Sequence, residues 1–196
     1  TQVNKKISMT FAKGLRAILR QDPDVVMIGE IRDLETAEIA IQASLTGHLV
    51  LATLHTNTAI GAVTRLRDMG VEPFLLSSSL IGVIAQRLVR VLNNDTKEAH
   101  KANAYECEVL KLNKDEAPII YKNNTLIDTG FDGRTGIYEL INIDENMKTL
   151  IHDGASERKL ELQARISSKS IRADGRRHVL SGLTTLEEVM RVTQED

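Results

Sequence analysis

Two short apolar runs separated by one helix-length segment constrain the fold more than any other feature of this sequence. The runs cover residues 25–28 and 49–54, and apolar residues recur at helical spacing between Asp33 and Gly47. Runs this short and this apolar are typical of strands buried on both faces. Strands that follow each other through a single helix pair in parallel, because a parallel connection needs a crossover. The expected fold class is therefore α/β, with a parallel sheet covered by helices.

Helical patterns on either side of these runs set the expected domain organisation. Helices are predicted over residues 10–19, 58–70 and 73–92, and again from Ile137 onwards. Suitable capping side chains precede the predicted helices: Thr10, Asp33, Thr58, Asp144, Ser156 and Thr185. From Asn93 to residue 135 the sequence is polar and irregular, which indicates a small inserted module. We therefore expect three parts, covering residues 1–92, 93–135 and 136–196.

Composition excludes several classes of protein. The net charge is −2 and only 3% of residues are aromatic, which argues against binding to nucleic acid. No apolar run has the length of a membrane span or the flanks of a signal peptide. The single cysteine, Cys107, excludes an internal disulfide framework and fits a reducing compartment. Because the chain opens at Thr1 inside a patterned segment, we read it as a piece of a longer protein.

Reactive side chains follow both apolar runs. Glu30 comes after the first, with Arg32 close behind, and His55 comes after the second. Ligands bind beyond the carboxyl ends of parallel strands, so Glu30 and His55 are expected at one rim. There they suit hydrolysis of a phosphate ester, with the carboxylate orienting or deprotonating water, directly or through Mg²⁺. The alternatives are that Glu30 only begins a helix and that Arg32 is a surface charge.

Four motifs together resemble the ATPases that power type II secretion and type IV pili, which are hexameric RecA-like motors. "DPDVVMIGEIRD" is similar to the family's variant Walker B segment, and "TGHLVLATLHTN" to its His box. "AQRLVR" and "GRTGIYEL" are similar to two further signatures, and "SGLTTLEEVMRV" favours the type II secretion branch. The resemblance implies the second half of a RecA-like P-loop NTPase domain, followed by the small module and a helical C-terminal subdomain.

The resemblance also assigns roles by position. It makes Glu30 the carboxylate that activates water and places His55 near the terminal phosphate. Four further residues are implied near the nucleotide or its subunit interface: His48, Arg32, Gln86 and Arg87. For Gln86 and Arg87, the end of a helix facing its own subunit is an equal alternative.

Two departures from the family pattern concern the cofactors. ATP and Mg²⁺ are implied, but the loop G-x-x-x-x-G-K-[ST] is absent from these 196 residues, so this chain alone is expected to be inactive. Many relatives bind zinc through two Cys-x-x-Cys pairs. The corresponding positions here carry no cysteine, so zinc is not expected: Asn93, Thr96, Asn123 and Leu126. Neither Cys107 nor His100 replaces the four ligands.

Without zinc, small apolar contacts are expected to hold the module together. The candidates are Val109, Leu110, Leu112, Ile119, Ile120 and Tyr121. The C-terminal part carries a basic run that reads as a solvated helix face or a contact with a neighbouring subunit or an acidic partner: Arg165, Lys169, Arg172, Arg176, Arg177 and His178.

The implied setting is a cytoplasmic homo-hexamer, attached at the periphery of the bacterial inner membrane through secretion platform proteins. Two alternatives stay open. One is a type IV pilus assembly motor of the same superfamily, and the other is a non-catalytic assembly domain, which the missing phosphate loop favours.

Overall fold

The computed structural model describes residues 11–113, 115, 117–124 and 130–193. The chain folds as two compact units, and each of them is made of two separate stretches of sequence. The first unit comprises Thr1–Val83 and Ile141–Ser167, and the second comprises Ile84–Leu140 and Ser168–Asp196. The division into residues 1–92, 93–135 and 136–196 stays a prediction.

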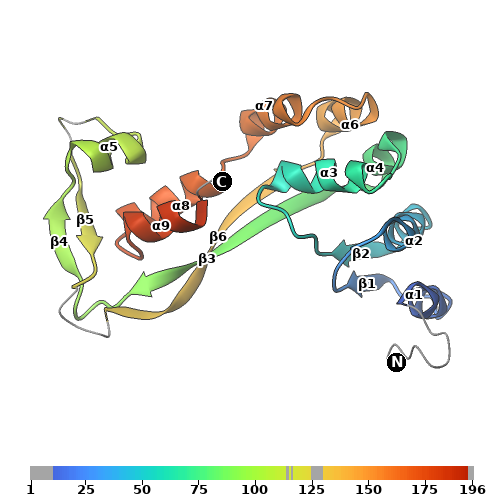
Figure 1. The fold of residues 1–196 in the computed structure, drawn as a ribbon, viewed down its shortest axis with the longest axis horizontal. Helices are drawn as coiled ribbons and strands as arrows, with labels where there is room; N and C mark the ends of the chain where they lie inside the picture. The colour runs from blue at the N-terminus through green and yellow to red at the C-terminus, as the bar shows by residue number, and fades with distance from the viewer. Residues whose placement is uncertain (1–10, 114, 116, 125–129, 194–196) are drawn as a thin grey trace. The chain divides into compact units, whose positions relative to one another are not determined.

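The first unit combines a pair of parallel strands with six helices among its described residues (Figure 1). Its elements are α1 Phe11–Leu19, β1 Val25–Ile28, α2 Leu34–Leu45, β2 Leu49–Ala52, α3 Ala59–Asp68, α4 Pro73–Ser79, α6 Glu145–His152 and α7 Glu157–Ser167. Strands β1 and β2 run parallel in a register that pairs Val25 with Leu49 and Ile28 with Ala52. Helix α2 packs against β2, α1 and α4, while α6 packs against α4 and α7. The parallel pairing confirms the main expectation from the sequence.

Strand β1 is buried on one face only, and no residue of β2 is buried. Val26 and Ile28 are 5% and 1% exposed, whereas Val25 and Met27 are 54% and 74% exposed. Leu49 and Leu51, their partners on β2, are exposed too. The prediction of strands buried on both faces is therefore wrong for the described residues, because side chains alternate between faces and the helices cover one of them.

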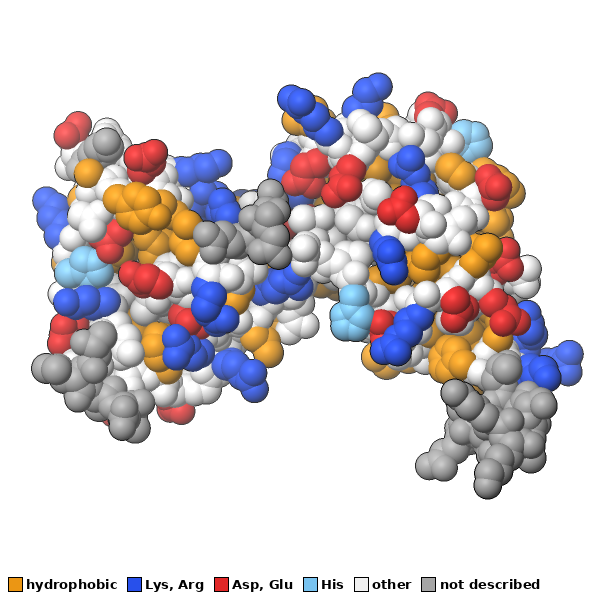
Figure 2. All heavy atoms as spheres, in the orientation of Figure 1, with side chains coloured by type: hydrophobic (Ala, Val, Ile, Leu, Met, Phe, Trp, Pro, Cys, Tyr) orange, Lys and Arg blue, Asp and Glu red, His pale blue; other side chains and the backbone are white. Residues whose placement is uncertain are grey.

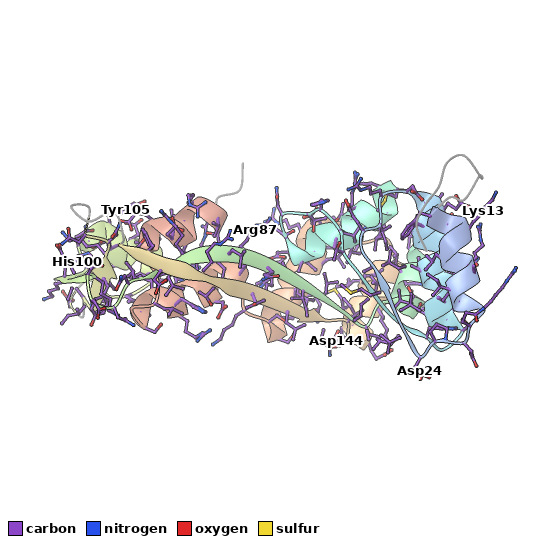
Figure 3. The ribbon with its side chains drawn as sticks, turned by 90° about the horizontal axis from the view of Figure 1, so that it is seen from below. Lys13, Asp24, Arg87, His100, Tyr105 and Asp144 are labelled. Carbon is purple, nitrogen blue, oxygen red and sulfur yellow. The ribbon has the colours of Figure 1, made fainter. Side chains whose placement is uncertain are left out.

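Side-chain caps start α2, α3 and α6 where the sequence predicts, whereas at the predicted cap Ser156 of α7 it is the backbone carbonyl that accepts, from Lys159 N–H at 2.9 Å and from Leu160 N–H at 3.1 Å. Asp33 accepts from the backbone N–H of Thr36 at 2.8 Å, and Asp144, at the start of α6 (Figure 3), accepts from that of Met147 at 2.8 Å. Thr58 caps α3 in the same way, by accepting from Gly61 N–H at 2.9 Å. The predicted cap Thr10 lies outside the described residues.

The second unit contains the long strands and the C-terminal helices. Its elements are β3 Gly82–Leu92, β4 Glu98–Lys101, α5 Ala104–Leu110, β5 Ile119–Lys122, β6 Phe131–Asn142, α8 Ile171–Leu180 and α9 Leu186–Thr193. Strands β3 and β6 pair with each other and both continue into the first unit, and β4 pairs antiparallel with β5. The helix predicted through residue 92 is wrong: α4 ends at Ser79, and β3 follows. The helical pattern predicted from Ile137 is also wrong as far as Asn142, which ends β6.

One apolar core joins the inserted module to the last two helices. It is formed by Val89, Ala102, Cys107, Leu110, Ile120, Ile137, Val179, Leu186 and Val189. Among the predicted module contacts, Leu110 and Ile120 are confirmed as buried, and Val109 packs against this core. Ile119 is 62% exposed, so its prediction is wrong. The module is thus stabilised by β3, β6, α8 and α9 as well as by its own side chains.

The basic run is not a uniform solvated face. Arg172 donates to the carbonyl of Thr193 at 2.7 Å, and Arg177 pairs with Asp174 at 2.9 Å. Arg165 pairs with Glu161 at 2.8 Å, and His178 is only 7% exposed. These contacts lie within single units and use part of the run to stabilise its own helices.

Candidate functional site

The carboxyl ends of β1 and β2 bring Glu30 and His55 together. The chain leaves β1 at Ile28 and β2 at Ala52, which are partners in the parallel register. Just beyond these ends, His55 Nε2 lies 3.1 Å from Glu30 Oε1. The side chain of Glu30 is 21% exposed and that of His55 is 88% exposed. The rim expected from the sequence therefore exists, with a carboxylate beneath a solvent-facing imidazole.

Arg32 occupies the other oxygen of the same carboxylate. Its Nε donates to Glu30 Oε2 at 2.6 Å, and its terminal nitrogen lies 2.5 Å from that oxygen. The hydrogen bond from Arg32 lowers the pKa of Glu30 below its ordinary value, and the charges of Arg32 and His55 act in the same direction. Glu30 also raises the pKa of Arg32 through the same hydrogen bond. Glu30 is thus ionised at neutral pH, with Oε2 accepting a hydrogen bond from Arg32 and Oε1 lying 3.1 Å from the ring nitrogen of His55.

Thr53 joins the two chain segments where the strands end. Its carbonyl accepts from the backbone N–H of Ile31 at 3.0 Å, and its hydroxyl donates to the carbonyl of Gly29. Thr53 lies within the stretch TGHLVLATLHTN, and the sequence alone gives it no role. The available signal was a threonine directly after a short strand that pairs with the strand leading to Glu30.

His48 lies at the other end of β2. It precedes the strand at Leu49, whereas His55 follows it after Ala52, so the strand of four residues separates them by about 13 Å at ~3.3 Å per residue. His48 Nδ1 lies 3.0 Å from the carbonyl of Ala43 and 3.2 Å from Thr46 Oγ1, at the end of α2. The structure therefore does not bring His48 to Glu30 and His55.

Gln86 and Arg87 belong to the second unit. They lie in the middle of β3, where Gln86 is exposed and Arg87 is half-buried (Figure 3). The alternative that these two residues form a helix end is wrong, because the segment is a strand. Their proximity to a nucleotide stays a prediction.

Two of the positions that would hold zinc, Asn93 and Thr96, lie in a hydrogen-bonded turn. The carbonyl of Asn93 accepts from Thr96 N–H at 3.3 Å and from Lys97 N–H at 3.0 Å, and its side chain accepts from Asp95 N–H at 2.9 Å. Among the described residues, no group of three or more His, Cys, Asp or Glu side chains could hold a metal ion. Leu126 lies outside the described residues, and the expectation of no zinc stays a prediction.

Comparison with known proteins identifies the family. The model of the type II/IV secretion system protein family matches residues 1–191. The chain belongs to this family. The type II secretion system protein E of Pseudomonas aeruginosa is 61% identical over 199 residues, covering 100% of this chain and 40% of that protein. The type II secretion system ATPase E of Vibrio cholerae is 59% identical over 198 residues, covering 100% of this chain and 39% of that protein.

Solved structures support the same assignment. The pilus retraction motor PilT with bound ADP matches with a TM-score of 0.67 and 30% identity, over 95% of this chain and 44% of that chain. The ATPase DotB of Yersinia pseudotuberculosis matches with a TM-score of 0.68 and 20% identity, over 94% of this chain and 40% of that chain, which shows the fold alone. The expected fold class, α/β of the RecA-like type, is confirmed. The chain spans about 40% of the length of the curated relatives.

The residues of this family member fit one half of an ATP site. The ionised carboxylate of Glu30 is the kind of oxygen donor that binds water or the hydration shell of Mg²⁺. An ATP site also needs a loop that binds the phosphates, and no G-x-x-x-x-G-K-[ST] loop occurs in the 196 residues. Among the described residues, no helix is long and apolar enough to cross a membrane.

Proposed function

We propose that this chain contains the second half of the nucleotide-binding domain of a longer ATPase, which hydrolyses ATP to drive type II protein secretion. The observation that carries the proposal is the Glu30 carboxylate at the rim of the parallel strands, 3.1 Å from His55. The match to relatives named type II secretion system proteins, at 61% and 59% identity, supports the assignment to type II secretion.

In the proposed reaction, Glu30 orients the attacking water. Its Oε1 lies on the side of the exposed His55, so a water there can donate a hydrogen bond to the carboxylate while its oxygen faces the terminal phosphate. A lowered pKa makes Glu30 a weak base and keeps its carboxylate ionised, so that it can accept hydrogen bonds. That suits phosphoryl transfer, whose loose transition state depends on positioning more than on early proton removal. Mg²⁺, when bound with ATP, neutralises charge on the phosphates.

His55 and Arg32 have different roles in this proposal. With 88% of its side chain exposed, His55 can reach the terminal phosphate from the rim without a change in β2. Arg32 is 76% exposed and can leave Glu30 for a neighbouring subunit. The phosphates themselves are held by a Walker A loop in the upstream half of the same domain.

The remaining assignments extend this proposal to the full-length protein. His48, Gln86 and Arg87 line the nucleotide site or its subunit interface, and the protein assembles as a homo-hexamer. The hexamer works in the cytoplasm, bound to inner-membrane secretion platform proteins. Support for these assignments comes from the family match over residues 1–191.

Replacing Glu30 by Gln in the full-length protein tests the function. Gln keeps the size of the side chain but loses the charge, so turnover of ATP is expected to fall at least ~100-fold while nucleotide binding persists. Phosphate release and binding of a fluorescent nucleotide, measured on the same preparation, separate the two effects. Normal hydrolysis by Glu30→Gln would show that the assigned role is wrong.

Two other functions have specific support. The similarity to PilT, at a TM-score of 0.67, supports a type IV pilus motor, and the genes next to the one that encodes this chain would separate it from a secretion motor. The absent phosphate loop supports a non-catalytic assembly domain. A full-length wild-type protein that hydrolyses no ATP would support that second alternative.

A further inference from the structure

The peptide groups on both sides of Glu30 are bonded to a single residue of the neighbouring strand segment. Thr53 accepts from the N–H of Ile31 through its carbonyl, at 3.0 Å, and donates to the carbonyl of Gly29 through its hydroxyl. We propose that Thr53 is a positioning residue, whose hydroxyl fixes the direction in which the Glu30 carboxylate points. This inference rests on the proposed function of Glu30.

The position of these bonds explains why they act on Glu30. The regular pairing of β1 with β2 ends at Ile28 and Ala52, two residues before Glu30. Beyond that point, the chain of β1 would be free to turn about the bonds of Gly29. The hydroxyl of Thr53 holds the carbonyl before Glu30 and its carbonyl holds the N–H after Glu30, so the backbone of Glu30 is restrained on both sides.

Because the bonded residues are exposed, the effect of the Thr53 hydroxyl on the position of Glu30 can be told apart from its effect on the stability of the fold. Gly29 and Thr53 are both exposed. If the hydroxyl is removed, water can satisfy the carbonyl of Gly29, so the folded state loses little. Water cannot replace the restraint on the backbone of Glu30, because it does not link the hydroxyl side chain of Thr53 to Gly29. The hydroxyl of Thr53 is therefore expected to matter for the rate and not for the fold.

The test variant is Thr53→Val in the full-length ATPase. Valine keeps the branched shape that suits a strand and removes only the hydroxyl. A small displacement of a catalytic group costs up to about 100-fold in rate, so kcat is expected to fall roughly 10- to 100-fold. KM for ATP is expected to change less than about twofold, because Thr53 does not touch the nucleotide in this proposal.

Two further variants serve as controls. Thr53→Ser retains the hydroxyl and is expected to restore most of kcat. Thr149→Val removes a hydroxyl that donates to the carbonyl of Glu145 at 2.9 Å on α6, and it is expected to leave kcat and KM unchanged. Thermal unfolding, followed by circular dichroism, is expected to give the same Tm for Thr53→Val and the wild type.

Each outcome decides the inference. A fall in kcat with unchanged Tm and rescue by Thr53→Ser supports it. It is overturned by a wild-type kcat in Thr53→Val, by a change confined to KM, by a Thr53→Ser that is as slow as Thr53→Val, or by a large loss of Tm. Glu30→Gln, assayed alongside, separates a failure of the proposed function from a failure of the positioning role. If Glu30→Gln stays active, the proposed function is wrong. If only Thr53→Val stays active, the positioning role of Thr53 is wrong.

Discussion

At the scale of single residues, Glu188 is a buried carboxylate whose pKa lies well below its ordinary value. Its side chain is 4% exposed and accepts from Arg90 at 2.7 Å and from Arg191 at 2.8 Å. Burial alone would favour the neutral acid, but the hydrogen bonds from both arginines and from the N–H of Arg90 outweigh it and lower the pKa of Glu188 to about 2. The Thr185 hydroxyl caps α9 as predicted, while the carboxylate of Glu188 contacts β3 instead of completing the capping box locally.

This shift predicts how the second unit responds to acid. Because the pKa of Glu188 is lower in the folded state than its ordinary value of 4.5, its contribution is fully present above pH 4.5. It is lost as the pH falls towards 2, by about 3 kcal/mol in total. Urea unfolding by circular dichroism, at steps between pH 7 and pH 2.5, measures the loss. Glu188→Gln is expected to be less stable at pH 7 and to flatten the profile in this range; an equally steep profile in the variant would contradict the assignment.

The residues of the candidate site were predictable to different degrees. Glu30 and His55 follow two runs whose register is fixed by burial of Val26 and Ile28, so the sequence alone indicates that they share a rim. The two bonds of Thr53 could not be predicted, because they depend on side-chain geometry just beyond the ladder. The resemblance to the family's His box grouped His48 with His55, but a strand places the residues before and after it at opposite ends.

At the scale of elements, the local sequence pattern gave the wrong element where a strand pairs with a segment far away in the sequence. Residues 82–92 carry apolar side chains that fit either a helix face or two faces of a strand, so the sequence predicts a single helix over residues 73–92. The segment forms β3 because it pairs with β6, about 50 residues later in the sequence. Val and Ile along β3 suit a strand, and such pairing is decided by tertiary contacts that a window of sequence does not contain.

Two helical glycines give opposite predictions for the same substitution. A Cβ at Gly175 in α8 would meet Val189 Cγ1 of α9 at 2.4 Å, whereas a Cβ at Gly14 in α1 would meet nothing within 4 Å. Gly175→Ala is therefore expected to destabilise its unit by about 1–3 kcal/mol through overpacking. Gly14→Ala is expected to stabilise α1 by about 0.5–1 kcal/mol, because alanine loses less backbone entropy. Chemical denaturation of both variants measures the signs, and equal signs would show that the close packing of α8 on α9 is wrong.

At the scale of the whole molecule, apolar side chains remain on the surface of both units. On the face seen in Figure 2, hydrophobic side chains lie between charged groups. In the first unit, four apolar side chains share the uncovered face of β1 and β2: Val25, Met27, Leu49 and Leu51. Neighbouring apolar side chains on a sheet face form a continuous patch of the kind that drives association.

This patch predicts reversible self-association of the isolated chain. Met27, 74% exposed in the middle of the patch, is the best position at which to introduce a charge. The wild type is expected to exceed its monomer mass of 21.7 kDa increasingly with concentration, and Met27→Lys to stay closer to that mass, because burying a lysine in the contact is costly. Sedimentation velocity over a concentration series measures both. Leu162→Lys adds the same charge at a 63% exposed position on α7 and is expected to leave association unchanged; if it reduces association as much as Met27→Lys does, the contact does not lie on the strand pair.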